Sequence, residues 1–326
     1  MAAIRRASFF VVLMLTAAVG LVSPADAANH VTTLMTFDAT AGELPEGIAI
    51  DKRGTMYLSF PLTGEIRAIT RNGAESTYAT LPHGPGFGPL GIAVDPQGNL
   101  YVAVNTGAST QGVYVVRRDG TTEQLAGTEA ITFPNDVTLD PRGNIYVSDS
   151  SGAVWRVPRR GGEAEPWLQD PLLVGDNSAP LPVPIGANGI EFRHNALYVV
   201  NTELGTIIRV PILPDGTAGT PEVFAQSPAL LGADGMAFDV HGNLYVAVNG
   251  QSTVVHVSSD GDTVTTIART TDGLDFPSAV AFGTGGGERQ TLFIINFAIS
   301  ELFGVPPGEG PAVLSLDAGV AGQPAR

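Results

Sequence analysis

The chain has 326 residues, no cysteine and a formal net charge of −15. The lack of cysteine excludes a disulfide framework and a lipoprotein anchor. So acidic a surface repels phosphate backbones, and we expect no binding to nucleic acid. The length allows one large domain or two. Glycine (40 residues) and proline (24 residues) lie between β-rich runs, which favours an all-β chain with many turns.

Residues 1–27 have the pattern of a secretory signal peptide. Arg5 and Arg6 form a basic start, an apolar run from Phe9 to Val22 follows, and Ala25-Asp26-Ala27 is a small-x-small cleavage site. The apolar run is shorter than a typical membrane span. Both general and twin-arginine export stay open. We therefore expect a secreted or periplasmic protein that keeps no membrane anchor once the signal is removed.

One short pattern recurs six times after the signal. Its first copy begins Pro45-Glu46-Gly47-Ile48-Ala49, and the second begins Pro89-Leu90-Gly91-Ile92-Ala93. The later copies begin at Pro134-Asn135, Ala187-Asn188, Ala233-Asp234 and Pro277-Ser278. The second residues of successive copies are separated by 44, 45, 53, 46 and 44 positions. A near-constant period of this size indicates a repeat architecture.

Each copy predicts four short strands. In the first, the runs 47–51, 55–60, 64–70 and 74–80 are separated by turns rich in Gly, Asn and Pro. Six such units predict an all-β fold, a six-bladed β-propeller with four-stranded antiparallel blades, in one domain that spans residues 28–326. We expect Val31–Phe37 to close the ring beside Ala312–Leu316, which removes exposed sheet edges. Which of these two strands lies outermost stays open.

The second residue of each copy starts an innermost strand and therefore faces the central channel near one end. In chain order these residues are Glu46, Leu90, Asn135, Asn188, Asp234 and Ser278. Two carboxylates and two amide oxygens among them form an all-oxygen set, which hard divalent cations prefer. Capping of strand entries is the alternative explanation, but it does not account for Glu in one blade and Leu in the next. We therefore predict that Glu46, Asn135, Asn188 and Asp234 are metal ligands.

These motifs resemble those of the senescence-marker-protein/gluconolactonase/luciferin-regenerating-enzyme family, which is related to paraoxonases and diisopropylfluorophosphatase. The motifs that carry the resemblance are Pro45-Glu46-Gly47, Pro134-Asn135-Asp136, Ala187-Asn188-Gly189-Ile190 and Ala233-Asp234-Gly235-Met236. The resemblance covers residues 40–317 and implies a six-bladed propeller in which the matching Glu, Asn, Asn and Asp hold one catalytic divalent cation. Calcium is the first choice, with manganese, zinc and magnesium as alternatives.

The resemblance implies a secreted metal-dependent hydrolase of small-molecule lactones or related esters, which we expect to be a monomer. Asp234 is expected to orient or deprotonate water while it also ligates the metal. His83, the only histidine in a link on the channel-facing side, is a second candidate for proton transfer. Asp136 is expected to support the ligands or to bind a second, structural cation.

Two positions depart from relatives in the resembled group. Sugar lactonases of that group often carry Arg two residues before the first Asn, where this chain has Phe133, and paraoxonases carry a catalytic His where this chain has Leu90. Both replacements are apolar, which favours a substrate less polar than an aldonolactone. Specificity is expected in the loops 105–112 and 169–186.

Two other functions stay open. The Gly-Ile-Ala-x-Asp-x-x-Gly-Asn-x-Tyr-Val units also resemble NHL repeats, so a non-catalytic propeller that binds a partner or a small ligand is one alternative. A metal-assisted lyase is the other, and His83 would be its only histidine base.

Overall fold

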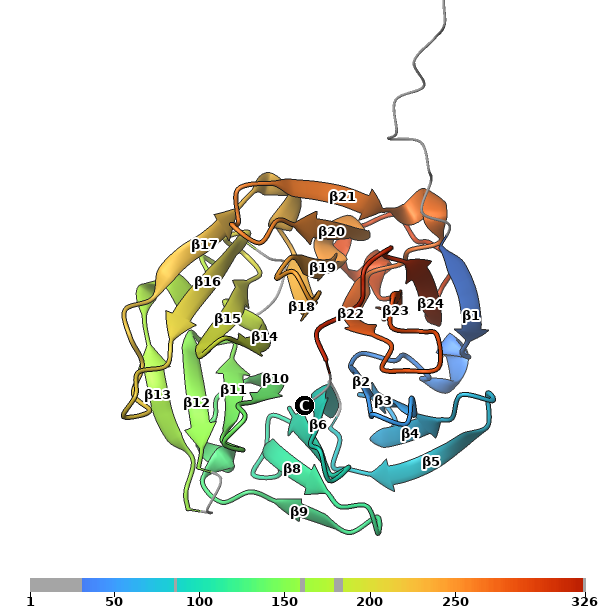
Figure 1. Ribbon diagram of the computed structural model, residues 1–326. Coiled ribbons are helices and arrows are strands. Elements are labelled where there is room, and N and C mark those ends of the chain that lie inside the picture. The colour runs from blue at the N-terminus through green and yellow to red at the C-terminus, as the bar shows by residue number, and fades with distance from the viewer. Residues whose placement is uncertain (1–30, 85–86, 159–161, 179–183, 325–326) are drawn as a thin grey trace, which may run out of the picture.

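A computed structural model describes residues 31–84, 87–158, 162–178 and 184–324. These residues form six four-stranded antiparallel sheets, arranged as blades around a central channel (Figure 1). The sequence-based prediction of a six-bladed β-propeller is confirmed. The predicted signal peptide lies outside the described residues.

Within the first five blades the strands follow chain order from the channel outward. Blades 1 and 2 contain β2 (Ile48–Ile50), β3 (Met56–Phe60), β4 (Glu65–Ile69), β5 (Glu75–Thr80), β6 (Pro89–Val94), β7 (Leu100–Val104), β8 (Gly112–Val116) and β9 (Thr122–Gln124). Blade 3 contains β10 (Pro134–Leu139), β11 (Ile145–Asp149), β12 (Ala153–Val157) and β13 (Glu165–Gln169). Blades 4 and 5 contain β14 (Ala187–Arg193), β15 (Ala196–Asn201), β16 (Thr206–Pro211), β17 (Glu222–Gln226), β18 (Ala233–Phe238), β19 (Leu244–Val248), β20 (Thr253–Val257) and β21 (Val264–Ala268).

The sixth blade joins the two ends of the propeller. It contains β22 (Pro277–Phe282), β23 (Thr291–Asn296), β24 (Ala312–Asp317) and, outermost, β1 (Thr32–Thr36). β1 pairs with β24 through registers such as Thr32 opposite Ser315. The predicted closure is therefore confirmed, and the order that the sequence left open is settled. β24 follows β23 as a direct antiparallel neighbour, so the edge left for β1 is the outer one.

The remaining described elements are short 3₁₀ turns in the loops. They are η2 (Ala39–Ala41), η3 (Thr128–Ala130), η4 (Pro171–Leu173), η5 (Pro228–Leu230), η6 (Asn249–Gln251), η7 (Thr270–Asp272) and η8 (Ser300–Phe303). Across the described residues, no helix has the length and apolar character needed to cross a membrane.

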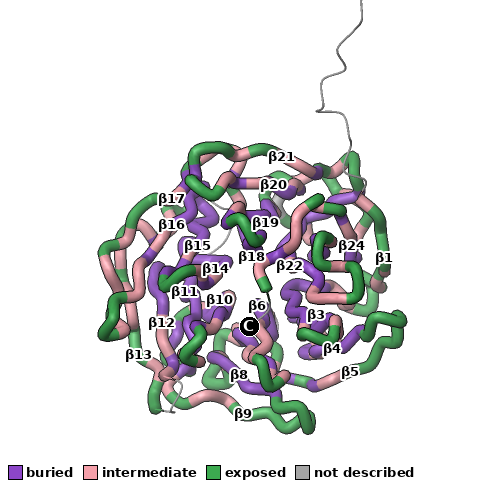
Figure 2. Tube along the Cα trace, viewed as in Figure 1, coloured by how far each residue is buried: buried purple, intermediate pink, exposed green. Residues whose placement is uncertain are grey.

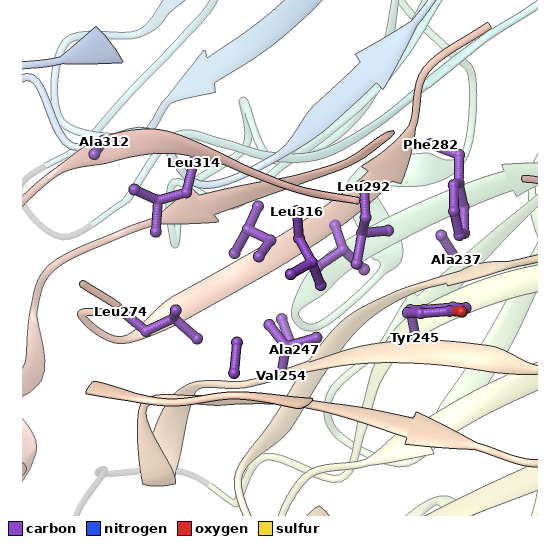
Figure 3. Packing of buried hydrophobic residues seen from close by; sticks show 13 residues of the cluster. Ala237, Tyr245, Ala247, Val254, Leu274, Phe282, Leu292, Ala312, Leu314 and Leu316 are labelled. Atoms are coloured by element: carbon purple, nitrogen blue, oxygen red, sulfur yellow. The ribbon is translucent and has the colours of Figure 1, made fainter. Parts of the chain in front are cut away.

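The hydrophobic core lies between neighbouring blades. Between blades 5 and 6, for example, Tyr245 meets the ring of Phe282 edge to face at 5.1 Å, and Leu292 and Leu316 pack nearby (Figure 3). Most residues of the outermost strands β5, β13 and β17 are exposed, whereas the inner strands are largely buried (Figure 2). Burial of both faces of the inner strands explains their continuous apolar runs and fixes them rigidly around the channel.

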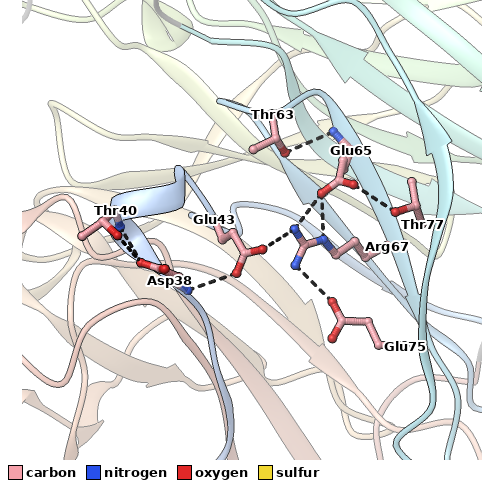
Figure 4. A network of polar contacts seen from close by, with 8 residues as sticks. All are labelled: Asp38, Thr40, Glu43, Thr63, Glu65, Arg67, Glu75 and Thr77. Atoms are coloured by element: carbon pink, nitrogen blue, oxygen red, sulfur yellow. Dashed lines mark hydrogen bonds and ion pairs between the residues drawn. The ribbon is translucent and has the colours of Figure 1, made fainter.

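A mostly buried arginine forms ion pairs that connect the segment before β2 to blade 1. Arg67 of β4 binds Glu43 and Glu65 at 2.7 Å each and Glu75 at 3.1 Å (Figure 4). Its guanidinium also lies 4.3 Å from the ring centroid of Phe60. Because Glu43 belongs to the connection from β1 to β2, this network links the outermost strand of the last blade to the first blade.

We call the second residue of each repeat copy its marker residue, and glycines that follow marker residues allow the inner strands to approach closely. A Cβ on Gly47 would lie 2.5 Å from the carbonyl oxygen of Leu90, and one on Gly189 would lie 2.2 Å from that of Asp234. Each of these glycines therefore packs against the marker residue of the next blade. This contact sets the width of the channel where the predicted ligands lie.

The segment after β24 runs across the channel (Figure 1), and it pairs with the end of β18 that lies opposite Asp234. Its backbone pairs with blade 5, since Val240 N–H donates to Ala321 O at 3.0 Å and Gln323 N–H donates to Phe238 O at 2.8 Å. Arg193 of blade 4 binds the Gln323 side chain at 2.9 Å. The C-terminal segment thus closes the far mouth of the channel.

Candidate metal centre

Irregular strand entries present the marker residues to the channel. Asn135, Asn188 and Asp234 are each the second residue of an innermost strand, within a shift of register after its first pair. Such bulges redirect a side chain that a regular ladder would fix. Glu46 comes just before β2, where its N–H donates to Ser59 O at 2.9 Å. The sequence placed these residues at strand entries, and the structure shows the bulges that turn them inward.

The four predicted ligands line one cavity of about 460 Å³ at the channel mouth. All four are buried, with exposed fractions of 8% for Glu46, 7% for Asn135, 4% for Asn188 and 7% for Asp234. Glu46, Asn135 and Asp234 also line a cavity of about 220 Å³ that continues toward the closed end. The set therefore separates an outer pocket from the inner channel, and residues from blades 1, 3, 4 and 5 meet there.

Hydroxyl groups fix the orientation of both asparagine amides. Asn188 Nδ2 donates to Thr202 Oγ1 at 3.0 Å, and the Thr202 hydroxyl donates a hydrogen bond to Ala233 O at 2.8 Å. Asn135 Nδ2 likewise donates to Ser150 Oγ at 3.0 Å, and Ser150 donates to a backbone carbonyl at 2.9 Å. Because each hydroxyl proton is already used, the hydroxyl can only accept from the amide. The amide nitrogen is held outward, and the amide oxygen takes the opposite side.

Two fully buried oxygens of the set have no hydrogen-bond partner among the described residues. They are Asn188 Oδ1 and Glu46 Oε2, both buried. A buried acceptor without a partner is costly and calls for an explanation. Among the described residues no three His, Cys, Asp or Glu side chains are grouped to hold a metal, so a cation here would depend on the amide oxygens as much as on the carboxylates. Aligned, unpaired, hard oxygen donors fit such a cation.

Burial and mutual repulsion disfavour charge on the carboxylates. Desolvation, and then Asp234 and Asp136, raise the pKa of Glu46 well above its usual range. Desolvation and Asp136 raise the pKa of Asp234 to about 8, against the hydrogen bond from Asn249 Nδ2 to its Oδ2 at 2.8 Å. A divalent cation would offset both effects, because it supplies the positive charge that the described cavity lining lacks.

Asp136 has a structural role in this geometry. Its carboxylate accepts the N–H of Val137 at 2.8 Å and, across the blade boundary, the N–H of Ile190 at 3.0 Å. It occupies the position that glycine holds in blade 1, and burial raises its pKa to about 6. These contacts join blade 3 to blade 4 beside the ligand set.

The other candidate residues lie apart from the ligands or contribute apolar surface. His83 is exposed and is not among the residues that line the cavity. Leu90 and Phe133 do line it. Ser278 donates to Glu46 O at 2.7 Å and so fixes the backbone of a predicted ligand.

The supporting residues Ser150, Thr202 and Asn249 were missed by the sequence reasoning. They follow the second strand of blades 3, 4 and 5 and lie 15, 14 and 15 positions after Asn135, Asn188 and Asp234, with which they form hydrogen bonds. That near-constant offset, with a small polar residue each time, is a signal that alignment of the repeats could have revealed.

A six-bladed propeller with a convergent oxygen site at one mouth of its channel is the class that the fold and site define. The chain belongs to the SMP-30/Gluconolactonase/LRE-like family, whose model matches residues 83–297. A search of curated proteins gives no significant match.

Solved structures share the fold at low sequence identity. A gluconolactonase from Xanthomonas campestris is 21% identical, with coverage of 90% of this chain and 93% of the other and a TM-score of 0.66. A calcium-binding protein, regucalcin, from Agrobacterium tumefaciens is 19% identical, with coverage of 89% and 94% and a TM-score of 0.63. Virginiamycin B lyase from Staphylococcus aureus is 16% identical, with coverage of 82% of each chain and a TM-score of 0.56. At these identities the similarity shows the fold alone.

Proposed function

We propose that the protein is an exported, divalent-metal-dependent hydrolase of lactones or related esters that acts as a monomer. Membership of the gluconolactonase-like family supports a lactonase-type activity. The observation that carries the metal is the pair of buried, unpartnered oxygens of Glu46 and Asn188. They lie in a cavity that also has room for a small molecule.

Each ligand has a separate role in this proposal. Glu46, Asn135 and Asn188 hold the cation, and the outward hydrogen bonds of the two amides keep their oxygens in place. A cation held there would polarise a substrate carbonyl and stabilise negative charge on its oxygen. Asp234 is the fourth ligand, and it also orients the attacking water and takes its proton, while Asn249 holds one oxygen of the carboxylate. Because His83 is exposed and outside the cavity lining, we assign this proton transfer to Asp234 alone.

Calcium is our first choice of cation. The donor set consists of oxygens alone, which favours a hard ion, and calcium accepts irregular arrangements of carboxylate and amide oxygens more readily than magnesium does. The name of the regucalcin structure, which describes it as calcium-binding, agrees with this choice.

The test is metal analysis of the purified protein, followed by assays on lactones and aryl esters with each metal restored after chelation. We expect one bound divalent ion per chain, loss of hydrolysis in chelator, and loss of both metal and activity in Asp234→Ala and Asn188→Ala. The matched control is His83→Ala, which should keep both. Full hydrolysis by metal-free protein would refute the metal role. A protein that binds metal but hydrolyses nothing would favour a ligand-binding propeller or a lyase.

A further inference from the structure

The cavity beside the ligand set is lined largely by apolar side chains. Four phenylalanines, which we call the aromatic lining, come from blades 2, 3 and 6: Phe87, Phe133, Phe276 and Phe297. The ring centroids of Phe87 and Phe133 lie 6.4 Å apart. Ile299 and Val305 extend this surface. Phe276 and Phe297 were not predicted as site residues, although the repeat positions relate them to the site. Phe276 lies two residues before Ser278, as Phe133 lies two residues before Asn135. Phe297 follows the second strand of its blade, as Ser150, Thr202 and Asn249 do.

Apart from the predicted ligands and Ser178, the polar side chains in the same lining are already engaged by the protein. Gln251 Nε2 donates to the carbonyls of Pro228 at 3.0 Å and Leu231 at 2.8 Å. The carboxylate of Glu203 accepts the N–H groups of Asn177 at 2.6 Å and Ile185 at 3.1 Å. Thr202 and Asn249 serve the ligands, as described above. No Lys, Arg, His, Tyr or Trp occurs among the described residues that line the cavity. Few donors are therefore left for the hydroxyl groups of a sugar.

One of the phenylalanines, Phe276, has a strained backbone that its surroundings hold in place. Phe276 has a φ of +48°, in the left-handed region that a bulky side chain rarely adopts. Its N–H donates to Ser252 Oγ at 3.1 Å, and Phe297 N–H donates to its carbonyl at 3.2 Å. Glycine would relieve the strain but would remove the ring. Strain of this kind is kept where the surroundings impose it, commonly at binding sites, which points to a function for the ring in the cavity.

From these observations we propose that the substrate is an apolar lactone or ester, with an alkyl or aryl group seated on the aromatic lining and no ring hydroxyl groups. This inference rests on the proposed function and specifies its substrate class. Water adds to the carbonyl carbon, the ring C–O bond breaks, and the leaving oxygen takes up a proton. The product of a lactone is thus a hydroxy carboxylate with the same apolar group.

The kinetic test compares γ-butyrolactone, γ-nonalactone and glucono-δ-lactone with metal-replete protein. We expect kcat/KM to rise about fourfold for each methylene that the lining covers, and glucono-δ-lactone to be the poorest substrate. Equal rates for the two γ-lactones, or a preference for glucono-δ-lactone, would overturn the inference and leave the proposed function intact.

A ketone has no bond that the protein could hydrolyse, so its binding tests the preference for apolar groups separately from the proposed hydrolase activity. Calorimetry should detect 2-heptylcyclopentanone with a negative heat-capacity change and should not detect cyclopentanone under the same conditions. If no lactone or ester is hydrolysed, the proposed function fails, and this measurement alone decides whether the cavity selects apolar groups. Absence of binding by the heptyl ketone would refute the selection.

The variant Phe276→Gly removes the ring and relaxes the backbone at once. We expect the kcat/KM ratio of γ-nonalactone to γ-butyrolactone to fall at least about tenfold, since a phenyl ring covers several methylenes. Ala298→Gly is the matched control, because Ala298 also has a positive φ, of +58°, but lies outside the cavity lining. It should leave the ratio unchanged. An equal fall in both variants, or none in Phe276→Gly, would contradict the role of the ring.

Discussion

Asn188 binds Thr202 through its amide nitrogen at 3.0 Å, and this contact leaves the amide oxygen of Asn188 buried without a partner. The Thr202 hydroxyl cannot donate to that oxygen, because it already donates its hydrogen bond to Ala233 O. The hydroxyl therefore determines which end of the amide faces the channel. An unpartnered oxygen is unfavourable in the metal-free protein and becomes favourable when a cation is bound.

The first prediction concerns Thr202→Val, which removes the hydroxyl and keeps the shape. The amide of Asn188 would lose its fixed orientation. We expect a fall of about 10- to 100-fold in metal affinity, the usual effect of removing a group that orients a ligand. Titration calorimetry with Ca²⁺ measures it directly and does not depend on a substrate.

Thr206→Val is the matched control for this change. Thr206 lies in the same blade and is buried, and its hydroxyl has no hydrogen-bond partner within the part of the chain that the structure describes. Its replacement should leave metal affinity unchanged and should keep or raise stability, since an unsatisfied polar group is removed. Equal losses of affinity in the two valine variants would show that orientation of the Asn188 amide is irrelevant.

The second prediction contrasts two buried aspartates of blade 5. Asp234→Asn should abolish metal binding yet raise the melting temperature of the metal-free protein, because it removes one of several mutually repelling carboxylates. Asp239→Asn should lower the melting temperature, since Asp239 accepts three hydrogen bonds, two from Asn243 and one from the N–H of His241. Calorimetry in chelator measures both. A lower melting temperature for Asp234→Asn would contradict the electrostatic account.

The third prediction concerns pH. The folded state raises the pKa values of Glu46, Asp136 and Asp234 above those of the unfolded chain. Between about pH 4 and pH 8 the folded, metal-free protein therefore binds more protons, and its free energy of unfolding falls as pH rises. Each proton contributes a slope of at most about 1.4 kcal/mol per pH unit.

Urea unfolding at pH 5 and pH 8 in chelator measures this slope. The variant Asp234→Asn shows how much of the change in the free energy of unfolding comes from Asp234. We expect the pH-dependent loss to be smaller in the variant than in the wild type. Calcium should restore stability at pH 8, because it replaces the protons on the carboxylates. A wild type and variant with identical pH profiles would show that Asp234 keeps an ordinary pKa when folded.

The repeat pattern was sufficient to predict the six blades, the ring closure and the convergence of Glu46, Asn135, Asn188 and Asp234 on one cavity of the channel. Each depends on features local to one repeat: strand alternation, turn residues and a fixed offset. Contacts between blades could not be predicted in this way. The engagement of Asp136 by Ile190 and the positive φ of Phe276 arise from packing between repeats, which a single repeat does not encode. The exposure of His83 likewise is not encoded in the pattern of one repeat.

The last prediction concerns the C-terminal segment that closes the far mouth. Arg193 donates to Asp239 O at 3.0 Å, to Val240 O at 3.2 Å and to Gln323 Oε1 at 2.9 Å, and it lies over the ring of Phe238. Arg193→Met would leave these acceptors without a donor and release the segment. We expect the free energy of unfolding to fall by about 2–3 kcal/mol.

Arg209→Met is the control within the same blade. Arg209 pairs with Glu222 on the outer strands, where both side chains are substantially exposed, so its loss should change stability by less than about 1 kcal/mol. Hydrogen exchange adds a local measurement: the amides of Val240 and Gln323, which bond the segment to blade 5, should exchange faster in Arg193→Met alone. Unchanged protection of these two amides would mean that backbone pairing holds the segment without the arginine.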